Sequence, residues 1–109
     1  MTVKELAEKL ELKVLAMPDG DREVTCGYAG DLLSWVMGKA PSDSAWFTIM
    51  SNVNIVAVAM LRDVAAIVVC EGAEIGDDVI ARAKEQDVNL LLSTKGMYEN
   101  CTELAKMLG

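Results

Sequence analysis

The chain has 109 residues, the usual length of one domain, and 52% of them are hydrophobic while only 5% are aromatic. This composition excludes a disordered chain and is typical of aliphatic strands covered by helices on both faces of a sheet. The formal net charge of −7 argues against nucleic acid as a partner, because such binding needs a cationic surface. The absence of histidine removes the most common general base and metal ligand.

The N-terminal segment predicts a helix followed by two strands. Thr2 can cap the helix, and Glu5 completes a capping box three residues later. A strand is expected over residues 13–17, a turn at residues 18–21 and a second strand over residues 23–28.

A second helix is expected from Asp31, whose carboxylate can cap it, to about Lys39. The apolar residues expected to form one broad buried face of this helix are Leu32, Leu33, Trp35, Val36 and Met37.

The remaining segments alternate between strand and helix. Strands are expected over residues 45–50, 65–70 and 88–92, and helices over residues 77–86 and 97–108. Residues 55–61 are compatible with a strand by propensity, but we favour a helix, because two parallel strands need a crossover of about this length. The alternation predicts one α/β domain over residues 1–109, with a mostly parallel sheet in a three-layer α/β/α arrangement.

Three widely spaced cysteines, Cys26, Cys70 and Cys101, form no C-x-x-C pair, so we expect free thiols in a reducing compartment. The N-terminus is too charged for a signal peptide, and the longest apolar stretch, around residues 55–61, is too short to span a bilayer. We therefore expect a soluble, cytoplasmic protein with no membrane partner.

Four loops are candidates for a ligand site, because ligands of open parallel sheets bind beyond the carboxyl ends of the strands. The loops are expected at residues 26–31, 51–54, 71–72 and 93–96. The residues in them that we expect to bind a ligand are Gly27, Tyr28, Gly30, Asp31, Asn52, Asn54, Ser93, Thr94 and Lys95.

Two of these loops also have a purely structural interpretation. The G-x-x-G spacing of Gly27 and Gly30 is equally typical of a tight strand-to-helix turn, and Asp31 would repel a phosphate from the helix terminus. Residues 93–96 resemble a phosphate-binding loop without its glycine-rich run, and they can instead cap the last helix. Lys95 still offers a positive charge to a phosphate.

No catalytic centre can be assembled from the sequence. Cys26 has no histidine to act as its base, and no serine lies in a G-x-S-x-G elbow. We therefore expect no enzyme activity, no cofactor and no metal site.

Residues 21–33, Asp-Arg-Glu-Val-Thr-Cys-Gly-Tyr-Ala-Gly-Asp-Leu-Leu, resemble the signature region of the DRTGG domain family. The resemblance continues in the same order through residues 46–50, 54–59, 65–69 and 92–95, so it covers nearly the whole chain. The residues that match in the signature region are Asp21, Arg22, Thr25, Gly27, Gly30 and Asp31.

The resemblance implies a noncatalytic regulatory module with an α/β fold like that of the N-terminal domain of HPr kinase. Such modules accompany CBS domains in inorganic pyrophosphatases, where adenine-nucleotide sensing is the associated role, and they occur in bacterial phosphotransacetylases. Single-domain versions are encoded near iron-only hydrogenase genes in anaerobic bacteria. The resemblance assigns no ligand contact to any one residue.

These observations lead to two hypotheses of function. The first is a regulatory or protein-interaction domain that acts with a separate partner enzyme, linked to hydrogenase or energy metabolism, and forms a homodimer through residues such as Tyr28, Trp35 and Met37. The second is a ligand-binding module for an adenine nucleotide, which rests on the cluster of loops and on Lys95.

Overall fold

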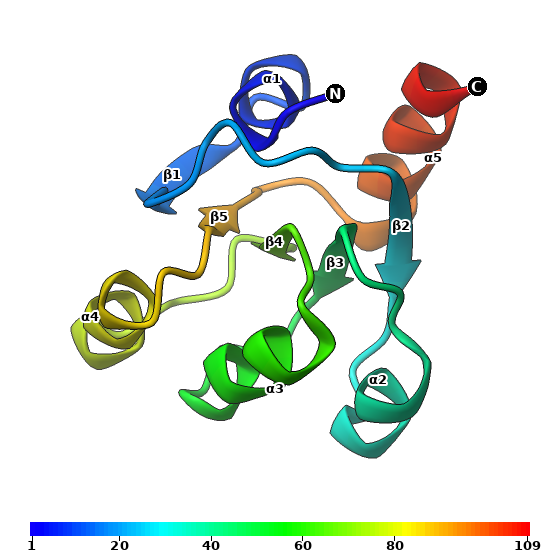
Figure 1. The fold of residues 1–109 in the computed structure, drawn as a ribbon. Coiled ribbons are helices and arrows are strands. Elements are labelled where there is room, and N and C mark those ends of the chain that lie inside the picture. The colour runs from blue at the N-terminus through cyan, green and yellow to red at the C-terminus, as the bar shows by residue number, and fades with distance from the viewer.

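Five helices and five strands make up the computed structural model, which describes residues 1–109 (Figure 1). The helices are α1 (Val3–Lys9), α2 (Leu33–Lys39), α3 (Asn54–Arg62), α4 (Asp77–Glu85) and α5 (Met97–Leu108). The strands are β1 (Lys13–Ala16), β2 (Cys26–Ala29), β3 (Ser44–Thr48), β4 (Ala66–Val69) and β5 (Leu90–Leu92). None of the helices has the length and hydrophobicity needed to span a membrane.

The strands form one sheet in the order β1-β5-β4-β3-β2. The three pairs among β2, β3, β4 and β5 are parallel, and β1 pairs antiparallel with β5. The expected three-layer α/β/α fold is confirmed, with a sheet that is mixed at one edge. The reason lies in residues 17–25, which join β1 to β2 without a crossover helix, so the two strands run in opposite directions.

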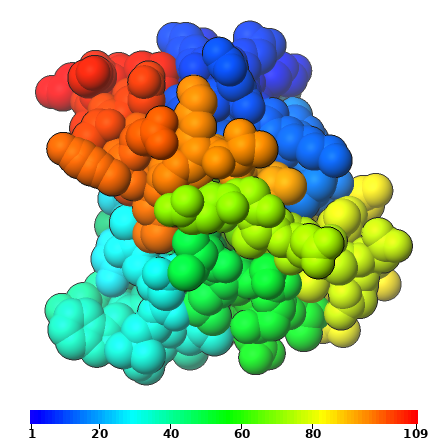
Figure 2. All heavy atoms as spheres, turned by 180° about the vertical axis from the view of Figure 1, so that it is seen from behind, coloured from blue at the N-terminus to red at the C-terminus, as the bar shows by residue number.

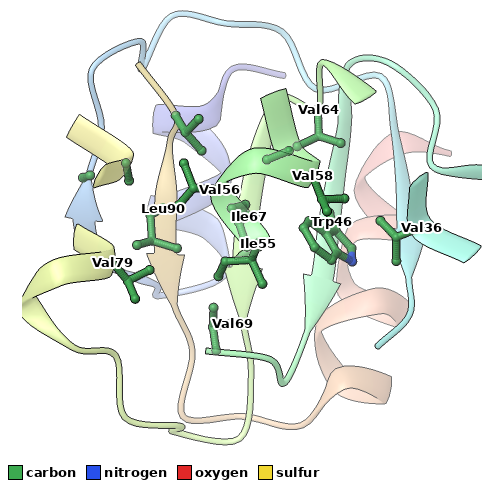
Figure 3. Close-up of a cluster of buried hydrophobic side chains, with 14 of the residues drawn as sticks. Val36, Trp46, Ile55, Val56, Val58, Val64, Ile67, Val69, Val79 and Leu90 are labelled. Carbon is green, nitrogen blue, oxygen red and sulfur yellow. The ribbon is translucent and has the colours of Figure 1, made fainter. Parts of the chain in front are cut away.

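Side chains of successive strand residues enter two separate cores, one on each face of the sheet. Trp46, Ile67 and Leu90 point into the core that α2, α3 and α4 cover, and Figure 3 shows this cluster. Phe47 and Leu91 point into the core covered by α1 and α5. Parallel strands buried on both faces explain the unbroken aliphatic runs of the sequence.

Several sequence predictions of elements are confirmed. Thr2 and Glu5 form the capping box of α1, with the Glu5 backbone nitrogen donating to Thr2 Oγ1 at 3.2 Å. The ambiguous segment at residues 55–61 lies in helix α3. The second strand, expected from residue 23, begins only at Cys26.

The prediction that Asp31 caps α2 is wrong. The N-cap residue is Leu32, and it makes no side-chain capping bond. The Asp31 carboxylate accepts hydrogen bonds from Thr48 Oγ1 at 2.7 Å and from the Ile49 backbone nitrogen at 2.8 Å. The buried hydroxyl and the free backbone N–H at the end of β3 therefore take the carboxylate away from the helix.

The predicted broad apolar face of α2 is also wrong. Only Val36 is buried, whereas Leu32, Trp35 and Met37 are 60%, 58% and 44% exposed. The cause is the position of α2, which is the outermost helix on its face of the sheet and has a helix neighbour, α3, on one side only (Figure 1).

Candidate functional site

The loops at the carboxyl edge, where the parallel strands end, lie together as the sequence suggested. The backbone nitrogen of Glu71 donates to the Lys95 carbonyl, and that of Gly72 donates to the Ser93 carbonyl, both at 2.8 Å. Figure 2 views this edge and shows the two loops in contact, residues 71–72 in yellow-green and residues 93–96 in orange. At the same edge, Asp31 bonds to the end of β3 through Thr48 and Ile49.

Gly27 and Tyr28, in contrast, lie within β2 and not in a loop. Gly27 pairs with Ala45 of β3, and a Cβ atom on Gly27 would lie 2.9 Å from Cδ2 of Leu104 in α5. The glycine therefore permits close packing of α5 on the strand. The loop itself begins at Gly30, whose carbonyl accepts a hydrogen bond from the Trp46 indole nitrogen at 3.0 Å.

An open cleft of about 690 Å³ at the carboxyl edge contains Asn52. The residues that line it are Ser51, Asn52, Val53, Glu74, Ile75, Gly76, Asp77, Asp78 and Val79. Its volume is in the range of small-molecule sites. Asn54 begins α3 and does not line the cleft, and its backbone nitrogen donates to Asn52 Oδ1 at 2.9 Å.

The fourth loop is organised around Asn100, a residue that sequence reasoning missed. Asn100 is 1% exposed, and its Nδ2 donates to Ser93 Oγ at 3.0 Å and to the Gly96 carbonyl at 2.9 Å. Ser93 Oγ also accepts from the Lys95 backbone nitrogen at 3.0 Å. Ser93 thus shapes the loop, while Thr94 is exposed and Lys95 is half-buried with no ion pair.

The N-terminus of α5 is surrounded by carboxylates. Glu99 Oε1 accepts from the Gly96 backbone nitrogen at 3.4 Å, and a Cβ atom on Gly96 would lie 3.2 Å from Glu71 Oε2. These groups already satisfy the positive end of the helix, so a bare phosphate gains little there. Gly96 of this loop is the N-cap residue of α5, but no side chain of residues 93–96 makes the capping bond, and Glu99 bonds back to Gly96 from within the helix.

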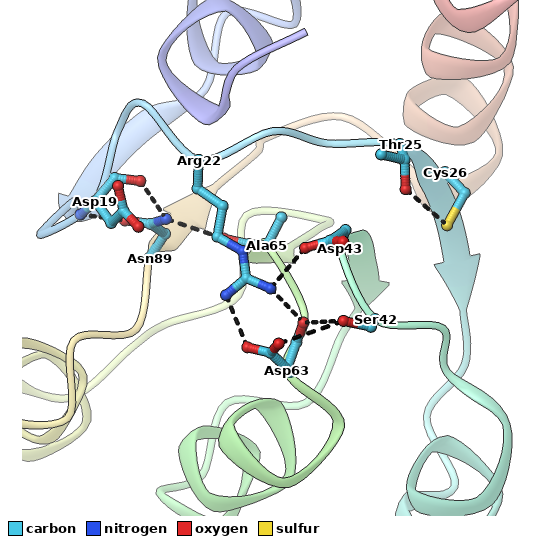
Figure 4. Close-up of polar contacts among 9 residues, drawn as sticks. All are labelled: Asp19, Arg22, Thr25, Cys26, Ser42, Asp43, Asp63, Ala65 and Asn89. Atoms are coloured by element: carbon cyan, nitrogen blue, oxygen red, sulfur yellow. Dashed lines mark hydrogen bonds and ion pairs between the residues drawn. The ribbon is translucent and has the colours of Figure 1, made fainter.

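Arg22 of the signature region lies at the amino edge, the opposite edge of the sheet, where the parallel strands begin (Figure 4). Its Nη2 donates to Asp43 Oδ1 at 2.8 Å and to the Asp63 carbonyl at 2.6 Å, and Nη1 lies 2.9 Å from Asp63 Oδ1. Partial burial lowers the pKa of Arg22, but its bonds to Asp43 and Asp63 outweigh this and raise the pKa above its usual value. The arginine therefore joins the turns that precede β3 and β4.

Two of the three thiols, those of Cys70 and Cys101, are chemically quiet. Burial raises the pKa of the Cys70 thiol to about 11, although Asn100 Nδ2 lies 3.5 Å from its sulfur and opposes the shift. Burial also raises the pKa of Cys101. Both thiols are therefore protonated, and poor nucleophiles, near neutral pH.

Comparisons with known proteins show the fold. Neither a family model nor a curated protein matches the sequence. Among solved structures, the chain is similar to the crystal structure of the CBS and DRTGG domains of the regulatory region of Clostridium perfringens pyrophosphatase, complexed with the activator diadenosine tetraphosphate. The TM-score is 0.74 at 9% sequence identity, over 94% of this chain and 45% of that chain, so this chain spans about half its length. The likeness supports a DRTGG-like fold.

Proposed function

We propose that this chain is a noncatalytic regulatory domain that forms a homodimer and acts on a separate partner enzyme. The observation that carries the proposal is the likeness of nearly the whole chain to the regulatory region of a pyrophosphatase.

The ligand proposed for this domain is an adenine nucleotide, bound at the carboxyl edge of the sheet. The solved structure that the chain resembles is a complex with diadenosine tetraphosphate. In this chain the cleft lined by Asn52 offers space for a nucleotide, and Lys95, in another loop of the same edge, offers a positive charge that is in no ion pair. The other residues proposed from the sequence are Gly30 and Asp31 in the first loop, with Thr94 beside the lysine.

The acidic surroundings set a condition on such binding. Glu74, Asp77 and Asp78 line the cleft, and Glu71 lies over the neighbouring helix terminus. A polyphosphate entering here meets repulsion unless a cation bridges the two sets of oxygens, and Mg²⁺ binds phosphate and carboxylate oxygens together. We therefore expect Mg²⁺ to strengthen nucleotide binding.

Thermal unfolding against a nucleotide panel tests the proposal. AMP, ATP and diadenosine tetraphosphate, each with and without Mg²⁺, should include at least one ligand that raises Tm, because a ligand of the folded state stabilises it. Asn52→Ala and Lys95→Met should abolish the rise, while Lys84→Met on the exposed side of α4 should preserve it. An unchanged Tm at millimolar concentrations of every nucleotide would sink the nucleotide role.

A further inference from the structure

The two outermost strands of the sheet, β1 and β2, are protected very differently from pairing with a strand of another chain. Edge strand β1 carries an exposed Lys13, and its pairing with β5 is irregular between Val14 and Ala16. Charges and irregular pairing of this kind prevent edge strands from pairing with other chains. Edge strand β2 has the sequence Cys-Gly-Tyr-Ala, without charge or proline, and pairs with β3 in regular register. It is an open template for another strand.

The outward backbone groups of β2 have no partner within the chain. The Gly30 backbone nitrogen donates to the Phe47 carbonyl, and with the register of β2 on β3 this means that the backbone groups of Cys26 and Tyr28 face β3, whereas those of Gly27 and Ala29 face outward. No loop or helix of the chain supplies a hydrogen bond to these outward groups. A strand laid along β2 would satisfy them.

Apolar surface flanks β2 on both faces of the sheet. On the α5 side lies a groove of about 300 Å³, lined chiefly by Gly27, Ala29, Phe47, Cys101, Leu104 and Leu108. On the other side Leu32, the N-cap residue of α2, and Trp35 within that helix are both exposed. Figure 2 shows β2 and α2, in cyan, meeting α5, in orange to red, along one side of the molecule.

Charge decides which partner suits this surface. Residues 24–42 contain one acidic residue, Asp31, and one basic residue, Lys39, so the whole net charge of −7 lies elsewhere in the chain. A basic partner protein would be drawn to the acidic faces and not to this neutral edge. A second copy of the chain carries the same negative charge, and it can approach closely only where neither copy brings net charge.

We propose that β2 pairs antiparallel with β2 of a second copy, so that two sheets become one continuous sheet. Antiparallel pairing of identical strands about a two-fold axis is self-complementary, since each outward donor meets an outward acceptor. Trp35 and Leu32 of each copy then pack beside the joined strands, and Trp is a frequent anchor of protein interfaces. This inference deepens the homodimer of the proposed function by assigning its surface.

Sedimentation equilibrium of the wild-type chain and four lysine variants tests the surface. The wild type should sediment as a dimer of the 11.8 kDa chain. Ala29→Lys and Trp35→Lys place a charge on exposed positions of the proposed interface, and each should weaken the dimer at least about tenfold. Val14→Lys on β1 and Met60→Lys on α3 place the same charge on exposed positions elsewhere, and the dimer should persist.

Amide hydrogen exchange provides a readout that a folding defect does not mimic. The amides of Gly27 and Ala29 should become more protected as the concentration of wild-type protein rises, and should stay unprotected in Trp35→Lys at equal thermal stability. A wild type that remains monomeric, or a dimer that survives both interface lysines, would overturn the assignment. Either result leaves a nucleotide-induced rise in Tm intact, so failure of this surface is distinguishable from failure of the sensing role.

Discussion

Arg22 shows how one side chain can stabilise several turns at once. Asp43 and Asp63 both have positive φ angles, 62° and 55°, a conformation that costs energy in residues other than glycine. The guanidinium contacts both of them, and both residues lie directly before or near the starts of central strands. We conclude that Arg22, a residue of the signature region, stabilises the amino edge of the sheet and has a structural role.

Replacing Arg22 with Met should therefore lower the free energy of unfolding by about 1 kcal/mol, because the Asp63 carbonyl and the carboxylates of Asp43 and Asp63, which are 48% and 69% exposed, lose the forked donor. Arg22→Lys should recover only part of the loss, since one ammonium cannot reproduce the forked contacts of a guanidinium. Urea unfolding measures both. As a control, Arg82→Met removes an exposed pair with Glu85 and should cost less than about 0.5 kcal/mol. Equal losses for the Arg22 and Arg82 variants would contradict this role.

Cys70 gives a prediction about pH. Because burial raises its pKa to about 11, the folded state binds a proton that the unfolded chain releases at lower pH. Stability from this thiol is fully present below the unfolded pKa, and it is lost as the pH rises through the folded pKa. Between pH 9 and 11 the free energy of unfolding should fall by roughly 2 kcal/mol more in the wild type than in Cys70→Ala. Parallel pH profiles of the two proteins would refute the prediction.

At the scale of elements, periodicity predicted most of the fold and failed where packing is long-range. Thr2 and Glu5 predicted the start of α1 because a capping box is local. The apolar residues of α2 did not predict its exposure, because Trp35 is left uncovered by the position of the helix at the end of its layer. The start of β2 was also misplaced, because pairing between strands decides where a strand begins. The sequence pattern of residues 23–25 is typical of a strand, but only Cys26–Ala29 pair with β3.

The sequence also predicted only part of the candidate site. The meeting of residues 71–72 with residues 93–96 follows from parallel topology, so sequence could predict it. The position of Glu71 over Gly96 and the use of Asn100 to shape the loop depend on contacts between separate elements. The one sequence signal for Asn100 was a polar residue on the inward face of an amphipathic helix.

At the scale of the whole molecule, the amino edge, the carboxyl edge and the outermost strand β2 have different properties. Arg22 holds the amino edge, the carboxyl edge presents an acidic cleft and, in a separate loop, Lys95, and β2 presents an uncharged strand that pairs on one side only. This separation allows a ligand and a second copy to bind without competing for the same surface. It is the arrangement that a regulatory domain needs, because binding at one surface can then alter assembly at another.

The most direct test of a regulatory, nucleotide-binding domain is a titration of the isotopically labelled chain with Mg²⁺ and diadenosine tetraphosphate, followed by amide NMR shifts. We predict saturable shifts that centre on Asn52 and Lys95, with Arg22 at the amino edge unmoved. Spectra that stay unchanged through millimolar nucleotide, or shifts confined to the surroundings of Arg22, would contradict the account.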